Sequence, residues 1–165
     1  RARAIAELTG IEVVMTRDSP DIAYPDNATT IAERKKADQH QRAELIRKTD
    51  NAVLISIHQN SMPDHPSVHG AQVFYNGAAS GPRLGETVQA ALNGAVNAGN
   101  GKNAKAIDST IYLMKNVQCP AILVECGFLS NRTETGQLLT GGYQLKLAVC
   151  IAAGFLQHDT EGASA

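Results

Sequence analysis

The sequence predicts an α/β domain, a three-layer sandwich in which helices flank a largely parallel, twisted central sheet. Two short apolar runs, residues 52–57 and 121–124, are bounded by polar residues, as is typical of strands covered on both faces in a parallel sheet. Longer segments with helical spacing alternate with them, and the chain has no internal repeat. Its 165 residues, 43% of them hydrophobic, fit one domain, which we assign to residues 1–158, with a frayed tail at 159–165.

The N-terminal part of the chain predicts a helix, a strand and a second helix. Residues 1–8 have helical apolar spacing without a preceding cap, and Gly10 can end that helix. The β-branched run at residues 11–16 predicts a strand. A polar segment from Asp26 or Asn27, both good N-caps, to about residue 48 predicts a long, mostly solvated helix. Because the chain starts inside a helical pattern, we expect that a preceding strand is missing.

Proline, glycine and capping signals place the later elements. Two prolines mark residues 59–69 as a loop. Ser130 or Asn131 can cap a short helix, and Glu134 stands in the capping-box position relative to Asn131. The other elements that we expect are a strand at 71–75, a helix at 81–98, the strand at 121–124 and a last helix from 143 to about residue 156.

Composition excludes several classes of function. The 15 basic and 16 acidic residues leave a formal net charge of -1, so no overall field attracts nucleic acid or anionic lipid. With 4% aromatic residues and no Trp, the chain lacks stacking platforms for single-stranded nucleic acid. Its three cysteines form no CxxC pair, which argues against a zinc knuckle or a disulfide framework, and no apolar run is long enough to span a membrane. A catalytic cleft is the favoured kind of site.

Two polar residues follow the apolar runs and are the candidates for chemistry. A lone histidine at the end of a buried strand can be a satisfied structural residue, but His58 follows residues 52–57 and precedes a polar loop, a position that suits a zinc ligand. Glu125 follows residues 121–124, where an unpaired carboxylate is costly to bury. It can act as a general base or can pair with Arg17 or Lys115. Both candidates stand at the carboxyl ends of strands, where ligands bind in such sheets.

Four segments in order along the chain resemble the N-acetylmuramoyl-L-alanine amidases of the amidase-3 type. The two most specific are Ser-Ile-His-Gln-Asn-Ser around His58 and Val-Glu-Cys-Gly-Phe-Leu-Ser-Asn around Glu125. The resemblance covers nearly the whole chain, and residues 111–115 look most like the members that act in sporulation. The four segments are residues 14–17, 56–61, 70–75 and 124–131.

The resemblance implies a zinc ion (Zn²⁺) held by two histidines and a glutamate, with a further glutamate as the general base. His58 matches the second histidine, and Glu125 matches the base. The first histidine and the ligand glutamate have no match, and neither Glu7 nor His65 and His69 is placed to replace them. We therefore expect that the chain lacks its N-terminal strand and first zinc ligands, and that these 165 residues alone are inactive or bind zinc weakly.

By the same resemblance, the substrate is peptidoglycan, and the bond cut joins N-acetylmuramic acid to L-alanine. The site of action implied is extracytoplasmic, in the cell wall or the spore cortex, and the sequence names no protein partner. Asn60 and Arg17 are candidates for substrate binding, although a turn contact and a structural ion pair are open alternatives. The competing hypothesis is a non-catalytic wall-binding or regulatory relative. A nucleotide-binding domain is disfavoured because no Gly-rich phosphate loop is present.

Overall fold

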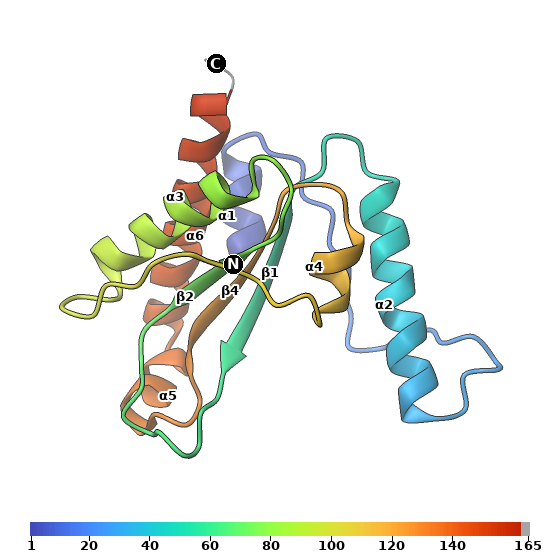
Figure 1. Ribbon diagram of the computed structural model, residues 1–165, viewed down its shortest axis with the longest axis horizontal. Coiled ribbons are helices and arrows are strands. Elements are labelled where there is room, and N and C mark those ends of the chain that lie inside the picture. Colours follow the sequence, from blue (N-terminus) through green and yellow to red (C-terminus); the bar gives the residue numbers. More distant parts are fainter. Residues whose placement is uncertain (163–165) are drawn as a thin grey trace.

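A computed structural model describes residues 1–162 and confirms the α/β class (Figure 1). One mixed sheet has the strand order β1-β4-β2-β3. β1 pairs with β4 and β2 with β3 in parallel, whereas β2 and β4 are antiparallel, so two of the three pairings have the expected direction. The strands are β1 (Leu54–Asn60), β2 (Gln72–Tyr75), β3 (Lys105–Ala106) and β4 (Ala121–Phe128). The helices are α1 (Ala2–Leu8), α2 (Ile31–Arg47), α3 (Gly81–Ala95), α4 (Tyr112–Asn116), α5 (Arg132–Leu138) and α6 (Gly141–Gly162).

Helices cover both faces of the sheet, and alternate residues of β4 point into the two cores that result. Ile122 and Val124 contribute to a core with α3 and α6, whereas Ala121 and Leu123 contribute to a second core with α4 and the end of α2. The four residues from Ala121 to Val124 are all buried, and so is Cys126. This two-sided burial explains why the run at 121–124 lacks the alternation of a half-exposed strand.

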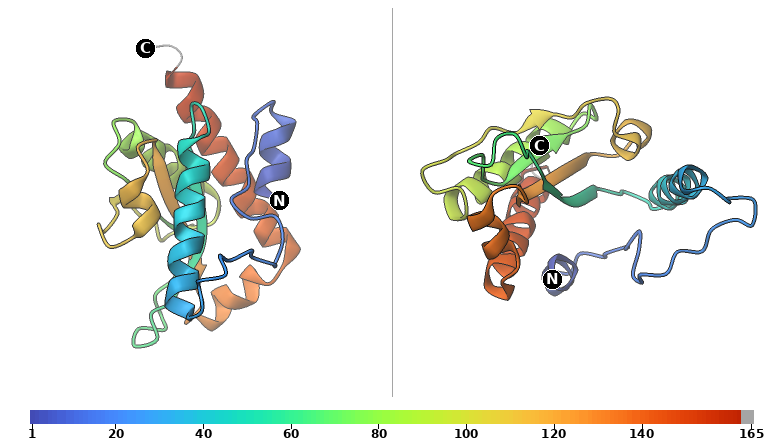
Figure 2. Two further views of the ribbon diagram at one scale, coloured as in Figure 1. Left: turned by 90° about the vertical axis from the view of Figure 1, so that its right-hand side faces the viewer. Right: turned by 90° about the horizontal axis from the view of Figure 1, so that it is seen from below.

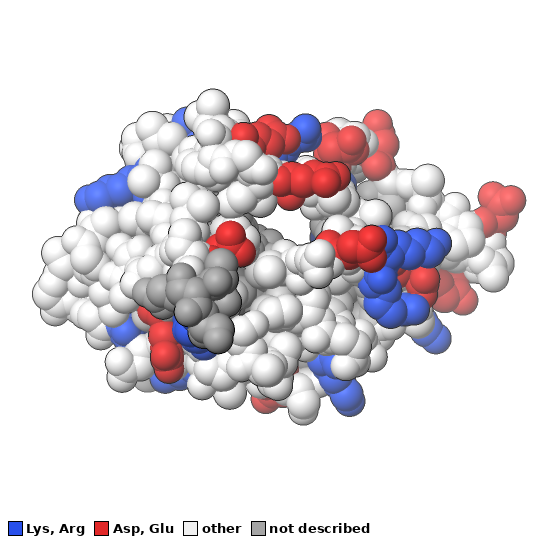
Figure 3. Space-filling view, turned by 90° about the horizontal axis from the view of Figure 1, so that it is seen from above, with Lys and Arg blue, Asp and Glu red and all other residues white. Residues whose placement is uncertain are grey.

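The helix α2 stands apart from the sheet, as the right-hand view of Figure 2 shows. Only Ala43 and Ile46 of this helix are buried. Seen from above, the molecule has an opening between the body that contains the sheet and the part that carries α2 (Figure 3). The helix begins at Ile31, later than expected, because Thr30 and Glu33 form a capping box. Glu33 N donates to Thr30 Oγ1 over 3.2 Å, and Thr30 N donates to Glu33 Oε2 over 2.8 Å.

The strand expected at residues 11–16 is not formed. This segment lies outside every ladder, and Val14 and Met15 are each 45% exposed. Among residues 1–162, β1 is the edge of the sheet on this side, and residues 11–16 do not pair with it. Local β-propensity therefore yields an extended segment without a partner.

Other boundaries differ from expectation by a few residues. β1 and β4 both extend beyond the apolar runs, so His58 and Glu125 lie within strands, not after them. α3 ends at Ala95, earlier than the predicted residue 98. The helix α6 continues to Gly162 through part of the tail that we expected to fray from residue 159, and residues 163–165 lie outside the described part of the chain.

The closest approach between helices depends on a glycine. A Cβ atom added at Gly154 of α6 would lie 2.5 Å from Cα of Val88 in α3. Val88 is fully buried in the core between these helices and the sheet. The backbones of α3 and α6 therefore pack at a distance that no larger residue permits.

We predict that Gly154→Ala lowers the free energy of unfolding by about 1–3 kcal/mol, because the added methyl overpacks the α3–α6 contact. Gly142 lies in the same helix and has no atom within 4 Å of an added Cβ, so Gly142→Ala is the matched control. It should be neutral or stabilise by roughly 0.5–1 kcal/mol. Urea unfolding of both variants measures the difference, and equal midpoints would contradict the packing argument.

Candidate active site

The register of two parallel strands brings His58 and Glu125 together. β1 and β4 are neighbours, and His58 pairs directly with Glu125. Paired residues on adjacent strands point to the same face, which here is the face that also carries Leu123. His58 is exposed and Glu125 is half-buried, so the pair lies where the sheet emerges from its second core. The structure thus brings together two residues that are 67 positions apart in the sequence.

One carboxylate oxygen of Glu125 lacks a partner. Its Oε2 atom is buried and accepts no hydrogen bond from the described residues. Burial raises the pKa of Glu125 above its ordinary value, and the charge of the neighbouring His58 opposes that increase. A buried acceptor without a donor costs free energy, and such groups with perturbed acidity are concentrated at functional sites.

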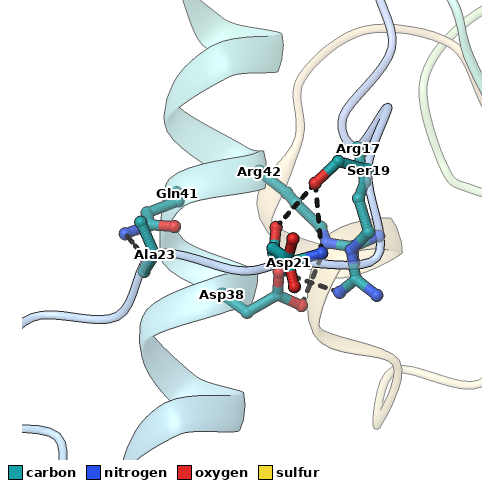
Figure 4. A network of polar contacts seen from close by, with 7 residues as sticks. All are labelled: Arg17, Ser19, Asp21, Ala23, Asp38, Gln41 and Arg42. Carbon is teal, nitrogen blue, oxygen red and sulfur yellow. Dashed lines mark hydrogen bonds and ion pairs between the residues drawn. The ribbon is translucent and has the colours of Figure 1, made fainter.

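Arg17 is not the partner of Glu125. Its Nη2 atom contacts Oδ1 of Asp38 in α2 over 3.2 Å, and Arg42 Nε contacts Oδ2 of the same carboxylate over 3.0 Å. Figure 4 shows both guanidinium groups converging on Asp38. Close by, Gln41 Nε2 donates to the carbonyl oxygen of Ala23 over 3.4 Å. The segment around Arg17 is therefore fastened to α2, as the structural alternative proposed. Among residues 1–162, no ion pair with Lys115 reaches Glu125 either.

Asn60 lies two residues after His58 and makes a local turn contact. Its Oδ1 atom accepts a hydrogen bond from Ser61 N over 2.8 Å. Its backbone carbonyl accepts a second hydrogen bond, from Leu129 N, over 2.7 Å. The amide side chain thus shapes the exit of β1 into the loop that follows.

Gln72 is a member of this constellation that the sequence did not reveal. It pairs with Glu125 from the other side, so His58, Glu125 and Gln72 form a row across β1, β4 and β2. Gln72 is buried, and its Nε2 atom donates to the carbonyl oxygen of Asn103 and, over 3.4 Å, to Oε1 of Gln89. Residues 70–75 already carried the family resemblance. The place of Gln72 beside Glu125 could not be predicted, because it depends on antiparallel pairing of β2 with β4.

The described residues fit part of the zinc site that the resemblance implies. His58 offers an exposed imidazole beside a carboxylate with one unpartnered oxygen. Catalytic zinc sites use three protein ligands, and residues 1–162 contain no group of three His, Cys, Asp or Glu side chains that could hold a metal. His69 is engaged with the carbonyl oxygen of Ser67 over 3.0 Å, and Glu7 pairs with Arg3 over 2.8 Å. Neither completes the site.

The contrast between two glutamates gives a prediction on stability. Glu125 has a buried oxygen without a donor, whereas the carboxylate of Glu134 accepts two backbone N–H groups. Without metal, Glu125→Gln should raise the free energy of unfolding by about 1 kcal/mol because a charge is no longer desolvated. Glu134→Gln should lower it by about 1–3 kcal/mol.

Thermal unfolding of both variants in a chelating buffer measures these opposite shifts. A destabilised Glu125→Gln variant would mean that the carboxylate of Glu125 is satisfied in the folded protein.

Comparison with known proteins gives a consistent result. The family described as N-acetylmuramoyl-L-alanine amidase matches residues 1–157. The germination-specific N-acetylmuramoyl-L-alanine amidase of Bacillus subtilis (strain 168) is 36% identical over 162 residues, which are 98% of this chain and 67% of that protein.

Solved structures agree with this match. The CwlD amidase from Clostridioides difficile, in complex with the GerS lipoprotein, superposes with a TM-score of 0.89 at 30% identity, over 96% of this chain and 81% of that one. AmiC2 of Nostoc punctiforme gives a TM-score of 0.76 at 28% identity, over 96% and 78%.

Proposed function

The chain belongs to the N-acetylmuramoyl-L-alanine amidases of the amidase-3 type, and we propose that it works as a zinc hydrolase centred on His58 and Glu125. The bond to be cut joins the lactyl group of N-acetylmuramic acid to L-alanine of the stem peptide. The observation that carries this proposal is the direct pairing of His58 with Glu125, whose buried Oε2 atom has no donor among the described residues.

His58 is the residue of this chain that we propose to hold the metal. Its exposed ring can offer one nitrogen to a zinc ion while the other is held by a hydrogen-bond acceptor. A bound zinc ion supplies Lewis acidity, which lowers the pKa of water from 15.7 to about 7 and polarises a carbonyl group. The proposal requires further ligands from outside residues 1–162, since the described residues provide no group of three.

Glu125 is the proposed general base. Its carboxylate accepts a proton from the attacking water, and it then returns that proton to the nitrogen of L-alanine as the C–N bond breaks. The products are the carboxylate of the muramic acid and the free amine of the peptide. Burial raises the pKa of Glu125, which brings its proton affinity closer to what a base needs near neutral pH.

We propose that Arg17 and Asn60 act differently from these two residues. Arg17 serves to attach residues 11–25 to α2 through Asp38, and it is not part of the reacting centre. Asn60 shapes the turn after His58 through its hydrogen bond with Ser61 N. Contacts of Asn60 with the glycan or peptide would be made from this position.

The place of action that we propose is the spore peptidoglycan, outside the cytoplasmic membrane. This is supported by the similarity to a germination-specific amidase and to an amidase solved in complex with a lipoprotein. We further propose that a lipoprotein partner binds this chain as well. Among the described helices, none by itself is long and apolar enough to cross a membrane.

The experiment combines zinc analysis of the full-length protein with digestion of purified cell walls, in which release of stem peptides is followed. Glu125→Gln should keep its zinc and lower kcat by about 10²–10⁴-fold, because only the proton transfer is lost. His58→Ala should lose both zinc and activity, because a ligand is removed. Arg17→Ala is the control and should digest walls at close to the parent rate.

Each part of the proposal can fail separately. Unchanged hydrolysis by Glu125→Gln would exclude it as the base. A parent protein that cleaves walls without zinc would exclude the metal. A parent protein that binds walls but releases nothing would favour the non-catalytic alternative.

A further inference from the structure

The strand that carries Glu125 has a bulge directly after it. His58 pairs with Glu125, but Asn60 pairs with Phe128, so β4 spans one residue more than β1 over this interval. The extra residue falls at Cys126–Gly127. A bulge re-aims the side chains beside it and breaks the regular ladder, so something else must fix its geometry.

Glu134 of α5 occupies the inside of this bulge. It is only 4% exposed, and its Oε2 atom accepts a hydrogen bond from Phe128 N over 2.6 Å. Its Oε1 atom accepts another from Gly70 N over 2.8 Å. Gly127 makes room for the carboxylate, because a Cβ atom there would lie 2.6 Å from Cδ of Glu134. One buried carboxylate thus joins the bulge to Gly70, two residues before β2 begins.

Two neighbours of Glu134 hold the rest of the loop that follows His58, residues 61–70. Ser130 Oγ accepts a hydrogen bond from Met62 N over 2.9 Å. Asn131 Nδ2 donates to the carbonyl oxygen of Pro66 over 3.0 Å. Together with the bond from Gly70 to Glu134, these contacts hold the loop at its beginning, middle and end. The loop after His58 is therefore bound to the segment after Glu125 beyond the last strand pair.

We propose that Glu134 is a positioning residue for amide hydrolysis. It holds the bulge that follows Glu125 and the loop that follows His58, and it thereby keeps Glu125 and His58 opposite each other. This inference rests on the proposed function, in which these two residues are the reacting pair. This role needs no contact of Glu134 with substrate or metal, because both of its carboxylate oxygens accept backbone N–H groups. Glu134 acts through Phe128 and Gly70, whose backbone N–H groups donate to its two carboxylate oxygens. Loss of this acceptor would leave the two N–H groups without a partner, which costs free energy.

The decisive variant is Glu134→Gln in the full-length protein, because the glutamine keeps one acceptor and turns its amide N–H₂ toward the other donor. We expect kcat to fall by roughly 10–100-fold with KM changed by less than about twofold, because a shift of the base affects the chemical step more than substrate binding. Amide hydrogen exchange at Gly70 and Phe128 should become faster in the same variant.

The matched control is Ile151→Ala, which removes buried apolar contacts of α6 and lowers stability without removing a hydrogen bond of Glu134. It should leave kcat and the exchange of both amides close to those of the parent. Gly127→Ala is the second variant, since its methyl group displaces the carboxylate of Glu134 without changing any charge. It should reproduce the loss of kcat, and combining it with Glu134→Gln should add little.

The inference is overturned if Glu134→Gln, or Gly127→Ala where the former does not fold, keeps the kcat of the parent. It is equally overturned if Ile151→Ala loses kcat in proportion to stability as the two variants do, because Glu134 would then be merely structural. An inactive parent protein would instead contradict the proposed function, while the exchange of Gly70 and Phe128 would still report on the brace.

Discussion

The parallel pairing of β1 with β4 is the constraint on which the site depends. β4 is buried on both faces, so its residues from Ala121 to Val124 are apolar. The register between β1 and β4 determines which residues of each strand face which core. A slip by one residue would turn Glu125 into the core of α3 and α6 and would separate it from His58. The hydrophobic effect that builds the sheet therefore also determines where the two polar side chains meet.

The same short stretch of chain holds two glutamates in opposite conditions. Glu134 is more buried than Glu125, yet each of its oxygens has a backbone donor. Glu125 is nearer to solvent, but one oxygen has none. Burial alone therefore does not mark a reactive carboxylate. The presence or absence of donors separates a group that stabilises the fold from one that is available to a proton, a metal ion or a substrate.

Sequence patterns predicted the α/β class, the strands β1 and β4 and the proximity of His58 to Glu125, because these follow from local apolar runs and from the sheet edge at which parallel strands end. Three features depend on contacts between distant residues and were not predictable. Residues 11–16 have strand propensity but no partner strand. Gln72 joins the row only through antiparallel pairing. Asn131 caps α5 as expected, accepting from Glu134 N, but the side chain of Glu134 turns to the bulge and not to its own helix start.

The isolation of α2 has a consequence for how the molecule opens. Its capping box and its network around Asp38 are internal to the helix and the segment that leads to it, and Ile46 at its C-terminal end joins it to the second core. No residue of this helix belongs to the core formed with α3 and α6, so that core would lose nothing if the helix came away. We therefore expect residues 17–47 to open as one subglobal unit, with faster amide exchange than β4, whose amides exchange only on global unfolding. Proteases should likewise cleave this unit first, because cleavage follows the segment that opens most readily.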